Sequence, residues 1–344
     1  MSNIIKNNSD ILFLYEAINC NPNGDPDQEN KPRMDYDTKT NLVTDVRVKR
    51  TLRDYLKNNE YEIFVDMEGD SKVSPETKLK AVIARSLENK DFLKKVFKEK
   101  EDYLEIYNKI FEDKENDTNQ VLAEITKKDF KHKEANFYLL EYLIKEKFVD
   151  IRMFGGAFAV AGFTHAYTGA IQLNWGYSLN KVELMESNSI VTIMNDDNST
   201  FGKDYRLYYS LLAFNGTINK NAALTTGLTD DDLTTFRDGL WKSVSAMPTR
   251  SKLNQYPKLY VEIIYNDGYY NGYFGDLRQY ISIEPVSDIE EKQIRSFKDI
   301  ILKTDKLKEL IENNKGEKKP IKEFYIQEAD GVSINLQNNK NQNE

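Results

Sequence analysis

A long helical stretch interrupts a β-prone sequence, and this interruption constrains the fold more than any other feature of the chain. Residues 66–148 are dominated by Lys, Glu, Leu and Phe at helical spacing. Before them lies the apolar run DILFLYEAINC at 10–20, and Gly, aromatic and β-branched residues return at 150–178, where GAIQLNWGYS is a good central-strand candidate. The pattern predicts one sheet whose chain leaves for a helical insertion and then returns.

The elements outside the insertion follow one another in an order that suits a ferredoxin-like α+β sheet. The order is strand, helix, strand, helical insertion, strand, hairpin, strand, helix and strand. Thr44 caps a predicted helix at 44–57, and a second strand is expected at 60–65. The runs SIVTIM and YRLYYSLL, separated by NDDNSTFGKD, predict a long β-hairpin between 189 and 212.

The C-terminal third continues with a helix and more strands. The segment TDDDLTTFRDGLWKSV predicts a helix beginning at Thr229, with acids in its first turn, and KLYVEIIY predicts a strand after it. The dipeptide Asp267-Gly268 marks a turn into further aromatic strand. A last helix is expected at 287–311.

Composition excludes several kinds of site. One cysteine, Cys20, forms no intramolecular disulfide, and two histidines make no cluster at zinc spacing. The nearly apolar run 153–163 is short of the roughly 20 residues that cross a bilayer. The N-terminus lacks a basic region followed by an apolar one, so we expect a cytoplasmic protein with no membrane partner and no cofactor.

A net charge of −8 argues against nucleic-acid binding on average, but positive charge gathers locally. In TDVRVKRTLRDYLK, helical geometry places Lys49, Arg53 and Lys57 in one i, i+4 row with Arg50 beside them. The opposite face is apolar, with Val48, Leu52, Tyr55 and Leu56. Like charges at this spacing cost roughly a few tenths of a kcal/mol each, which favours an anion alongside. A solvated face on a surface helix remains the alternative.

The segment DIRMFGGAF places a cation and two large apolar side chains directly before two glycines. Paired glycines permit close backbone approach. We therefore expect the backbone amides of Gly155 and Gly156, together with Arg152, to bind phosphates. Met153 or Phe154 would then pack against a base. A tight turn between core segments is the equally weighted alternative.

Two further groups of cations are candidates for the same role. In the predicted hairpin, Met194 provides an apolar wedge and Lys203 and Arg206 provide charge, although charges on an edge hairpin also deter aggregation. In MPTRSKLNQYPKL, Arg250 and Lys252 lie in a loop before a strand. Phosphate contact and surface solubility are both consistent with that placement.

The acidic loop at 21–41 offers a competing chemistry. Asp25, Asp27, Asp35 and Asp37 lie within it, and paired carboxylates hold Mg²⁺ in phosphodiester hydrolysis. Aspartates also cap turns in loops rich in Pro and Gly, which is the more common role. No nucleophilic triad assembles around His165. A Mg²⁺-dependent ribonuclease that uses Asp25 is therefore the second hypothesis.

Five motifs in order over about 10–265 resemble a known family. They are NPNGDPD, TDVRVKRTLRDYL, DIRMFGGAF, YTGAIQLNWGYS and TGLTDDDL…TRSK. Together they resemble the CRISPR-associated backbone subunit of type I Cascade complexes, with subtype I-B the best match. The resemblance implies a protein of antiviral defence without catalytic activity. Its copies would stack as a helical filament along a CRISPR guide RNA, beside other Cascade subunits, and the guide would pair with a target DNA strand.

The resemblance also implies a division of the chain and a set of contact residues. The expected parts are an RRM-like palm at 9–65 and 149–286, helical fingers at 66–148, a hairpin thumb at 187–212, a C-terminal helix and extension at 287–336, and a disordered tail at 337–344. The basic helix would hold phosphates, Arg152 to Gly156 would line the guide groove, and the thumb would fold over the RNA of a neighbouring copy. The predicted RNA-binding residues are Asn21, Asn23, Arg47, Lys49, Arg50, Arg53, Arg152, Met153, Phe154, Gly155, Gly156, Met194, Lys203, Arg206, Arg250 and Lys252. Related type III subunits carry a catalytic aspartate in a loop near the first helix, which keeps Asp25 open as a ribonuclease residue.

Overall fold

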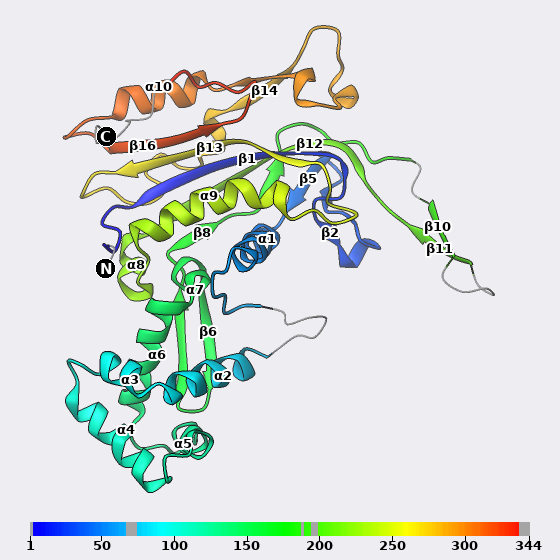
Figure 1. Cartoon of the computed structure of the whole chain (residues 1–344). Helices are drawn as coiled ribbons and strands as arrows, with labels where there is room; N and C mark the ends of the chain where they lie inside the picture. The colour runs from blue at the N-terminus through cyan, green and yellow to red at the C-terminus, as the bar shows by residue number, and fades with distance from the viewer. Residues whose placement is uncertain (1–2, 67–73, 187–188, 194–198, 337–344) are drawn as a thin grey trace. The chain divides into compact units, whose positions relative to one another are not determined.

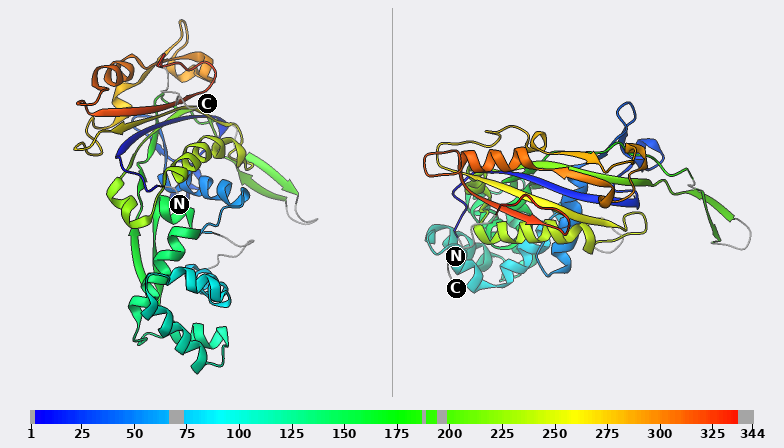
Figure 2. Two further views of the ribbon diagram at one scale, coloured as in Figure 1. Left: turned by 60° about the vertical axis from the view of Figure 1, so that its left-hand side comes forward. Right: turned by 90° about the horizontal axis from the view of Figure 1, so that it is seen from above.

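The computed structural model describes residues 3–66, 74–186, 189–193 and 199–336 (Figures 1 and 2). The chain forms two compact units, each built from separate stretches of sequence. The smaller unit comprises 1–5, 56–170 and 221–234, and the larger unit comprises 6–55, 171–220 and 235–344. No helix among the described residues combines the length and apolarity needed to cross a membrane.

The larger unit is organised by an eight-stranded sheet in which every pairing is antiparallel. The strand order is β16-β13-β1-β12-β9-β5-β4, and β8 also pairs with β12. The bounds are β1 Ser9–Cys20, β4 Met34–Asp35, β5 Thr40–Val43, β8 Ile171–Leu173, β9 Gly176–Ser178, β12 Leu207–Ile218, β13 Gln255–Tyr265 and β16 Ile321–Glu328. The prediction of a mixed α+β fold is confirmed.

Strand β1 lies in the middle of this sheet because its sequence is apolar on both faces. Alternate residues of a strand point to opposite sides, and the side chains of Ile11, Leu12, Phe13 and Leu14 are all inaccessible to solvent. One face packs into a core completed by the C-terminal segment, including Leu307 from α10 (Asp305–Asn314). The run DILFLYEAINC therefore forms the predicted strand, and the fold places it inside the sheet with both of its faces covered.

Helices α1 and α9 belong for most of their length to the larger unit. Helix α1 spans Asp45–Asn58 and follows β5, as the capping residue Thr44 predicts. Helix α9 spans Asp230–Ala246, and its Arg237 binds Glu262 of β13 with an Nε–Oε2 distance of 2.8 Å. Since Glu262 is 0% exposed, this ion pair fixes the middle of α9 against the sheet.

The smaller unit contains the predicted helical stretch and a two-stranded sheet. Its helices are α2 Pro75–Glu88, α3 Lys90–Val96, α4 Glu101–Asp113, α5 Thr118–Ile125, α6 Lys133–Lys147 and α7 Val149–Phe154, and α8 (Lys220–Thr226) begins at its border. Strands β6 (Gly155–Val160) and β7 (Phe163–Thr168) form a hairpin. The side chain of Asn136 is buried among the helices, where its Oδ1 accepts from the Tyr107 hydroxyl at 2.7 Å and its Nδ2 donates to the carbonyl of Ile125 at 2.8 Å. The helical insertion is thus confirmed.

The strand expected at 60–65 is wrong. Residues 61–66 form neither helix nor strand, and the amides of Phe64 and Val65 donate to the Asp150 carboxylate at 2.8 and 3.1 Å. A buried carboxylate therefore replaces the neighbouring strand as the acceptor for these amides. Asp150 comes from a distant part of the sequence, so the local sequence pattern does not reveal that a side chain, and not a strand, accepts these hydrogen bonds.

The long hairpin expected at 189–212 is only partly present. Strands β10 (Ser189–Ile193) and β11 (Ser199–Lys203) pair with each other, whereas YRLYYSLL forms the start of β12 in the main sheet. Residues 209–214 are buried without interruption, which requires cover on both faces. An arm of an isolated hairpin does not supply such cover.

The C-terminal third departs from prediction at two places. The aromatic segment after Asp267-Gly268 forms turns and the 3₁₀ helix η2 (Leu277–Tyr280) instead of a strand, because Gly268, Gly272 and Gly275 all have positive φ angles. The helix expected at 287–311 is replaced by short elements. These are η3 Glu291–Gln293, η4 Phe297–Asp299, β15 Ile300–Lys303, which pairs with β14 Ser282–Pro285, and α10.

Gly155 provides a test of the β6–β7 hairpin. Its φ and ψ of 71° and −174° lie in a region that is essentially limited to glycine, and an added Cβ would lie 2.2 Å from the carbonyl oxygen of Tyr167. Gly155→Ala should lower the free energy of unfolding by about 3 kcal/mol, through backbone strain together with this clash. Gly268→Ala is the matched control, because its φ is 89° and nothing lies within 4 Å of its added Cβ, so it should cost only about 1 kcal/mol. Urea unfolding measures both, and equal losses would contradict the assigned close approach.

Candidate nucleic-acid interface

The capping residue of helix α1, Thr44, is positioned by Asn23 of the preceding loop. Thr44 Oγ1 accepts from the amide of Arg47 at 3.2 Å, and Asn23 Oδ1 accepts from both the amide and the hydroxyl of Thr44, at 2.9 and 3.0 Å. The apolar positions Val48 and Leu52 are 5% and 1% exposed, which anchors the helix along its inner face. Asn23 is one of the predicted RNA-binding residues, and the structure gives it the role of fixing the start of α1.

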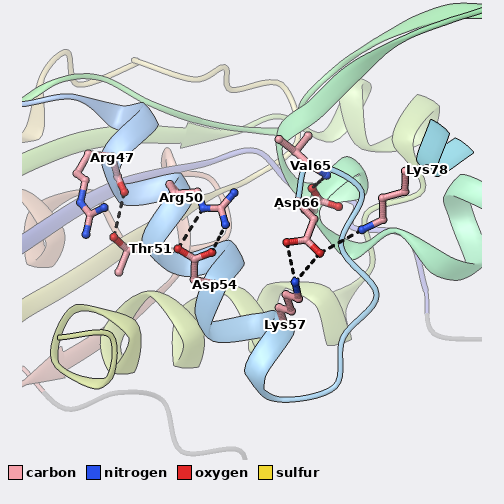
Figure 3. A network of polar contacts seen from close by, with 9 residues as sticks. Arg47, Arg50, Thr51, Asp54, Lys57, Val65, Asp66 and Lys78 are labelled. Atoms are coloured by element: carbon pink, nitrogen blue, oxygen red, sulfur yellow. Dashed lines mark hydrogen bonds and ion pairs between the residues drawn. The ribbon is translucent and has the colours of Figure 1, made fainter. Parts of the chain in front are cut away.

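Several cations predicted to face an anion already have acidic partners. Lys49 Nζ lies 2.9 Å from Asp45 Oδ2. Arg50 donates from Nε to Asp54 Oδ2 at 3.1 Å (Figure 3). These acids lie four residues away along the helix, so they offset the repulsion that seemed to demand an external anion. A phosphate at Lys49 or Arg50 would have to displace a carboxylate.

The last cation of the row also has acidic partners. Lys57 Nζ lies 2.8 Å from Asp66 Oδ2, and Lys78 Nζ lies 3.3 Å from the same oxygen (Figure 3). The Asp66 side chain is only 8% exposed, which strengthens these contacts relative to pairs at the open surface. Lys57 therefore supports the packing of the segment after α1.

A second group of cations gathers at the C-terminal end of β1. The backbone of Asn21 donates to the carbonyl of Ser251 at 2.8 Å, which holds the 249–254 loop beside the strand end. Arg206 Nη1 donates to the carbonyl of Asn19 at 3.1 Å, and Arg206 Nη2 donates to that of Arg250, also at 3.1 Å. Arg206 and Arg250 share Asp204, through contacts of 2.9 and 3.2 Å to its Oδ2. The structure thus brings together residues that are distant in the sequence.

Arg47 and Lys252 complete this group without acidic partners. Burial lowers the pKa of Arg47, and burial together with the nearby Arg47 charge lowers the pKa of Lys252. Among the described residues neither side chain forms an ion pair. Two half-buried cations beside each other are costly, and a bound anion would relieve that cost. We call Arg47, Arg206, Arg250 and Lys252 the strand-end cluster.

Cys20 and Asn21 lie beside the strand-end cluster, but both are buried. Burial raises the pKa of the Cys20 thiol to about 12, although Arg206 and Lys252 act in the opposite direction. Asn21 is 2% exposed and donates from Nδ2 to the carbonyl of Asn30 at 2.8 Å. The structure therefore gives Asn21 a role in positioning the loop, and its side chain presents no surface to a ligand.

The DIRMFGGAF segment is built into the core of the smaller unit. Arg152 forms two hydrogen bonds with the Asp232 carboxylate, at 2.8 and 2.7 Å, and donates from Nη1 to the carbonyl of Lys145 at 3.0 Å. Met153 is fully buried and Phe154 is 9% exposed, so the expectation that either packs against a base does not fit their positions. Gly155 and Gly156 begin β6, which pairs closely with β7. The alternative of a tight turn between core segments describes this region.

The hairpin residues are placed unevenly. Met194 lies outside the described residues. Lys203 ends β11 opposite Ser189, and its Nζ lies 3.5 Å from Glu29, which also accepts from the Tyr205 hydroxyl at 2.8 Å. Arg206 belongs to the strand-end cluster and not to the hairpin.

The acidic loop uses its aspartates in turns. Asp25 Oδ1 accepts from the amide of Asp27 at 3.1 Å and caps the 3₁₀ helix η1 (Pro26–Gln28), between the paired strands β2 (Gly24–Asp25) and β3 (Lys31–Pro32). Asp35 accepts in the same way from the amide of Asp37 at 3.1 Å. Within the described residues, no three Asp, Glu, His or Cys side chains are grouped so as to hold a metal ion. The observed contacts are those of capping residues.

Comparison with known proteins identifies the family. The family model for CRISPR-associated protein Cas7 matches residues 7–305. This chain belongs to the Cas7 family. A CRISPR-associated protein Cas7 from Haloferax volcanii is 28% identical over 313 residues, covering 89% of this chain and 83% of the relative.

Two solved structures also resemble this Cas7 chain, at lower similarity. A chain of a CRISPR RNA-guided surveillance complex, pre-nicking, has a TM-score of 0.45 and 13% identity, covering 77% of this chain and 80% of its own length. A chain of another CRISPR RNA-guided surveillance complex has a TM-score of 0.38 and 12% identity, covering 77% and 72%. The family assignment therefore depends on the sequence match.

Sequence reasoning missed an exposed tryptophan and a half-buried arginine next to the NPNGDPD loop of this Cas7 chain. Trp175 is 45% exposed, and the Arg33 guanidinium lies 5.9 Å from its ring centroid. The amide of Arg33 donates to the carbonyl of Asn23 at 3.0 Å, which ties it to the start of α1. The run KPR at 31–33 was the available signal, and the surrounding aspartates obscured it.

The Arg152–Asp232 pair predicts a loss of stability when it is broken. Both side chains are largely buried, at 13% and 8% exposure, so Arg152→Ala would leave an uncompensated carboxylate and cost roughly 3 kcal/mol of unfolding free energy. Asp232→Ala alone should also destabilise, and the double variant should lose much less than the sum of the two. Urea unfolding of the four proteins measures the coupling, and additive losses would show that the pair is not a structural contact.

Proposed function

We propose that this Cas7 chain is the guide-RNA-binding backbone subunit of a type I CRISPR Cascade complex and has no catalytic role of its own. The observation that carries the proposal, beside the family, is the strand-end cluster. Arg47 and Lys252 are partly desolvated cations that form no ion pair among the described residues, and RNA phosphates would supply negative charge beside them.

The chemistry of the cluster suits the RNA backbone more than a particular base sequence. Arg250 has a side chain that is 66% exposed, while Arg206 is anchored by two backbone carbonyls. Cations of this kind, one exposed and one anchored, contact phosphates and position the RNA backbone. Sequence would then be read by pairing between guide and target DNA.

The finer parts of the proposal follow from the family resemblance in the sequence. They include subtype I-B, an RRM-like palm with fingers and thumb, and stacking of copies as a filament with other Cascade subunits. Lys49, Arg50 and Arg53 are proposed as secondary phosphate contacts, because most of the positive charge on this face of α1 is offset by Asp45 and Asp54. The hairpin β10–β11 is the proposed thumb.

Removing the two unpaired cations should weaken RNA binding at every sequence. Arg47→Ala with Lys252→Ala should reduce affinity for single-stranded RNA at least about tenfold, since hydrogen bonds to charged groups contribute roughly 1.5 kcal/mol each. The slope of log affinity against log salt should fall by about 0.7 for each lost phosphate contact. Fluorescence anisotropy over a salt series, after removal of co-purified RNA, measures both quantities.

The matched control is Lys49→Ala with Arg50→Ala, which removes the same charge from cations that already have acidic partners. We expect a smaller loss of affinity and a smaller change of slope. A larger effect in the control would move the phosphate site to the row on α1. Unchanged binding in both double variants would overturn the proposed function.

We expect the charge of Lys252 to favour RNA binding and to lower the free energy of unfolding. Because burial holds its pKa below 10.5 in the folded chain, its charged form is disfavoured there, and the cost to stability is present at neutral pH. Lys252→Met should therefore keep or raise the free energy of unfolding at pH 7 while weakening RNA binding. The gain should disappear as the pH rises through the titration range of lysine, where the wild-type side chain loses its charge. Urea unfolding at pH 7 and pH 10.5 tests this, and a clear loss of stability at pH 7 would contradict it.

A further inference from the structure

The smaller unit contains a cleft that shares no residue with the strand-end cluster. Its volume is about 720 Å³, within the range of about 300–1,000 Å³ typical of ligand sites. The start of α4, the loop before α6, α6 itself and the turn between β6 and β7 form its walls, all within one compact unit (Figure 1).

Aromatic rings make up much of the wall. Tyr103 and Tyr138 meet edge to face with centroids 5.9 Å apart, and Tyr138 stacks on Phe97 behind it at 6.0 Å. Phe137 is 38% exposed although its ring packs against His165 at 4.7 Å. These contacts hold the rings in place, so a flat group entering the cleft meets preformed aromatic surfaces.

Positive charge surrounds the rings. Lys100, Lys128 and Lys133 line the cleft against one carboxylate, Glu134. Within the part of the chain that the structure describes, none of these three lysines forms an ion pair. Lys100 Nζ lies 5.8 Å from the centroid of the Tyr103 ring, and all three lysines are exposed. The cleft therefore has a net charge of +2 from its lining residues, with ammonium groups free to meet anions.

We propose that this cleft binds single-stranded nucleic acid, with a base against the aromatic wall and the adjoining phosphates at the lysines. Aromatic faces accept any base, and lysine binds phosphate as a point charge without reading base edges. The site would therefore tolerate many sequences and depend strongly on salt. It is a second nucleic-acid contact, independent of the proposed guide-RNA site.

Cross-linking locates the contact directly. The protein is the full chain with Arg47→Ala and Lys252→Ala, freed of co-purified RNA, and the probe is a 12-nucleotide single-stranded DNA containing 5-iododeoxyuridine. After irradiation, mass spectrometry should find the cross-links at Tyr103, Phe137 or Tyr138. Cross-links confined to other residues, or no binding of the probe, would overturn the proposal.

Affinity measurements separate the contribution of the aromatic rings from that of the lysines. Phe137→Leu keeps an apolar side chain of similar size and removes the ring, so it should weaken binding of the same DNA about fivefold or more. Lys100→Ala with Lys133→Ala should lower the salt slope by about 0.7 per lost contact. The control is Lys80→Ala with Lys94→Ala, which removes equal charge from exposed lysines on α2 and α3 outside the cleft.

The outcomes distinguish this proposal from its competitors. An equal loss in the Lys80/Lys94 control would show that only overall charge matters, and would overturn the cleft assignment. A polyglutamate peptide that competes as well as the DNA would show that the occupant is an acidic peptide instead. Thermal unfolding midpoints equal to that of the parent protein establish that Phe137→Leu is folded. Failure at the cleft leaves the guide-RNA proposal intact, because that proposal depends on Arg47 and Lys252.

Discussion

The antiparallel pairing of β1 between β12 and β13 is the constraint on which the larger unit depends. Antiparallel partners begin where their neighbour ends, so both β12 and β13 start at the C-terminal end of β1. Cys20 pairs with Leu207, and Ala17 pairs with Gln255. The residues just before these partner strands, Arg206 and Lys252, are therefore brought to one place. The cationic cluster follows from sheet topology and not from any contiguous motif.

Charge in this acidic chain is distributed so that most cations are neutralised locally. Lys49 and Arg50 have acids one helical turn away, and Arg152 has a largely buried carboxylate. The strand-end cluster differs because Asp204 is shared by two arginines, while Arg47 and Lys252 have no ion pair among the described residues. Net charge is thus a poor guide to binding here. What matters is which cations remain uncompensated after the chain has folded.

The local sequence pattern predicted helices and strands correctly where a short-range effect determines them. Thr44 and the apolar face of α1 predict that helix, and the apolar run of β1 predicts a strand, because capping and burial act over short distances. The pattern failed where a distant partner decides. Phe64 and Val65 bond to Asp150, and the start of β12 was taken for a hairpin arm because its partner β1 lies far back in the sequence. The same limit applies to the site. Arg47, Arg206 and the pair Arg250 and Lys252 were predicted from separate segments of the sequence, and only the fold shows that they adjoin.

The NPNGDPD loop acquires its function from this arrangement. Asn23 holds Thr44 and thereby the first turn of α1, from which Arg47 extends. Asn21 holds Ser251, next to Lys252. Two asparagines of one loop thus set the positions of Arg47 and Lys252, the two members of the strand-end cluster that form no ion pair among the described residues, one through a helix cap and one through a loop contact. The aspartates between them cap turns of the same loop, so the acidic segment that suggested metal-dependent cleavage also shapes the backbone around these cations.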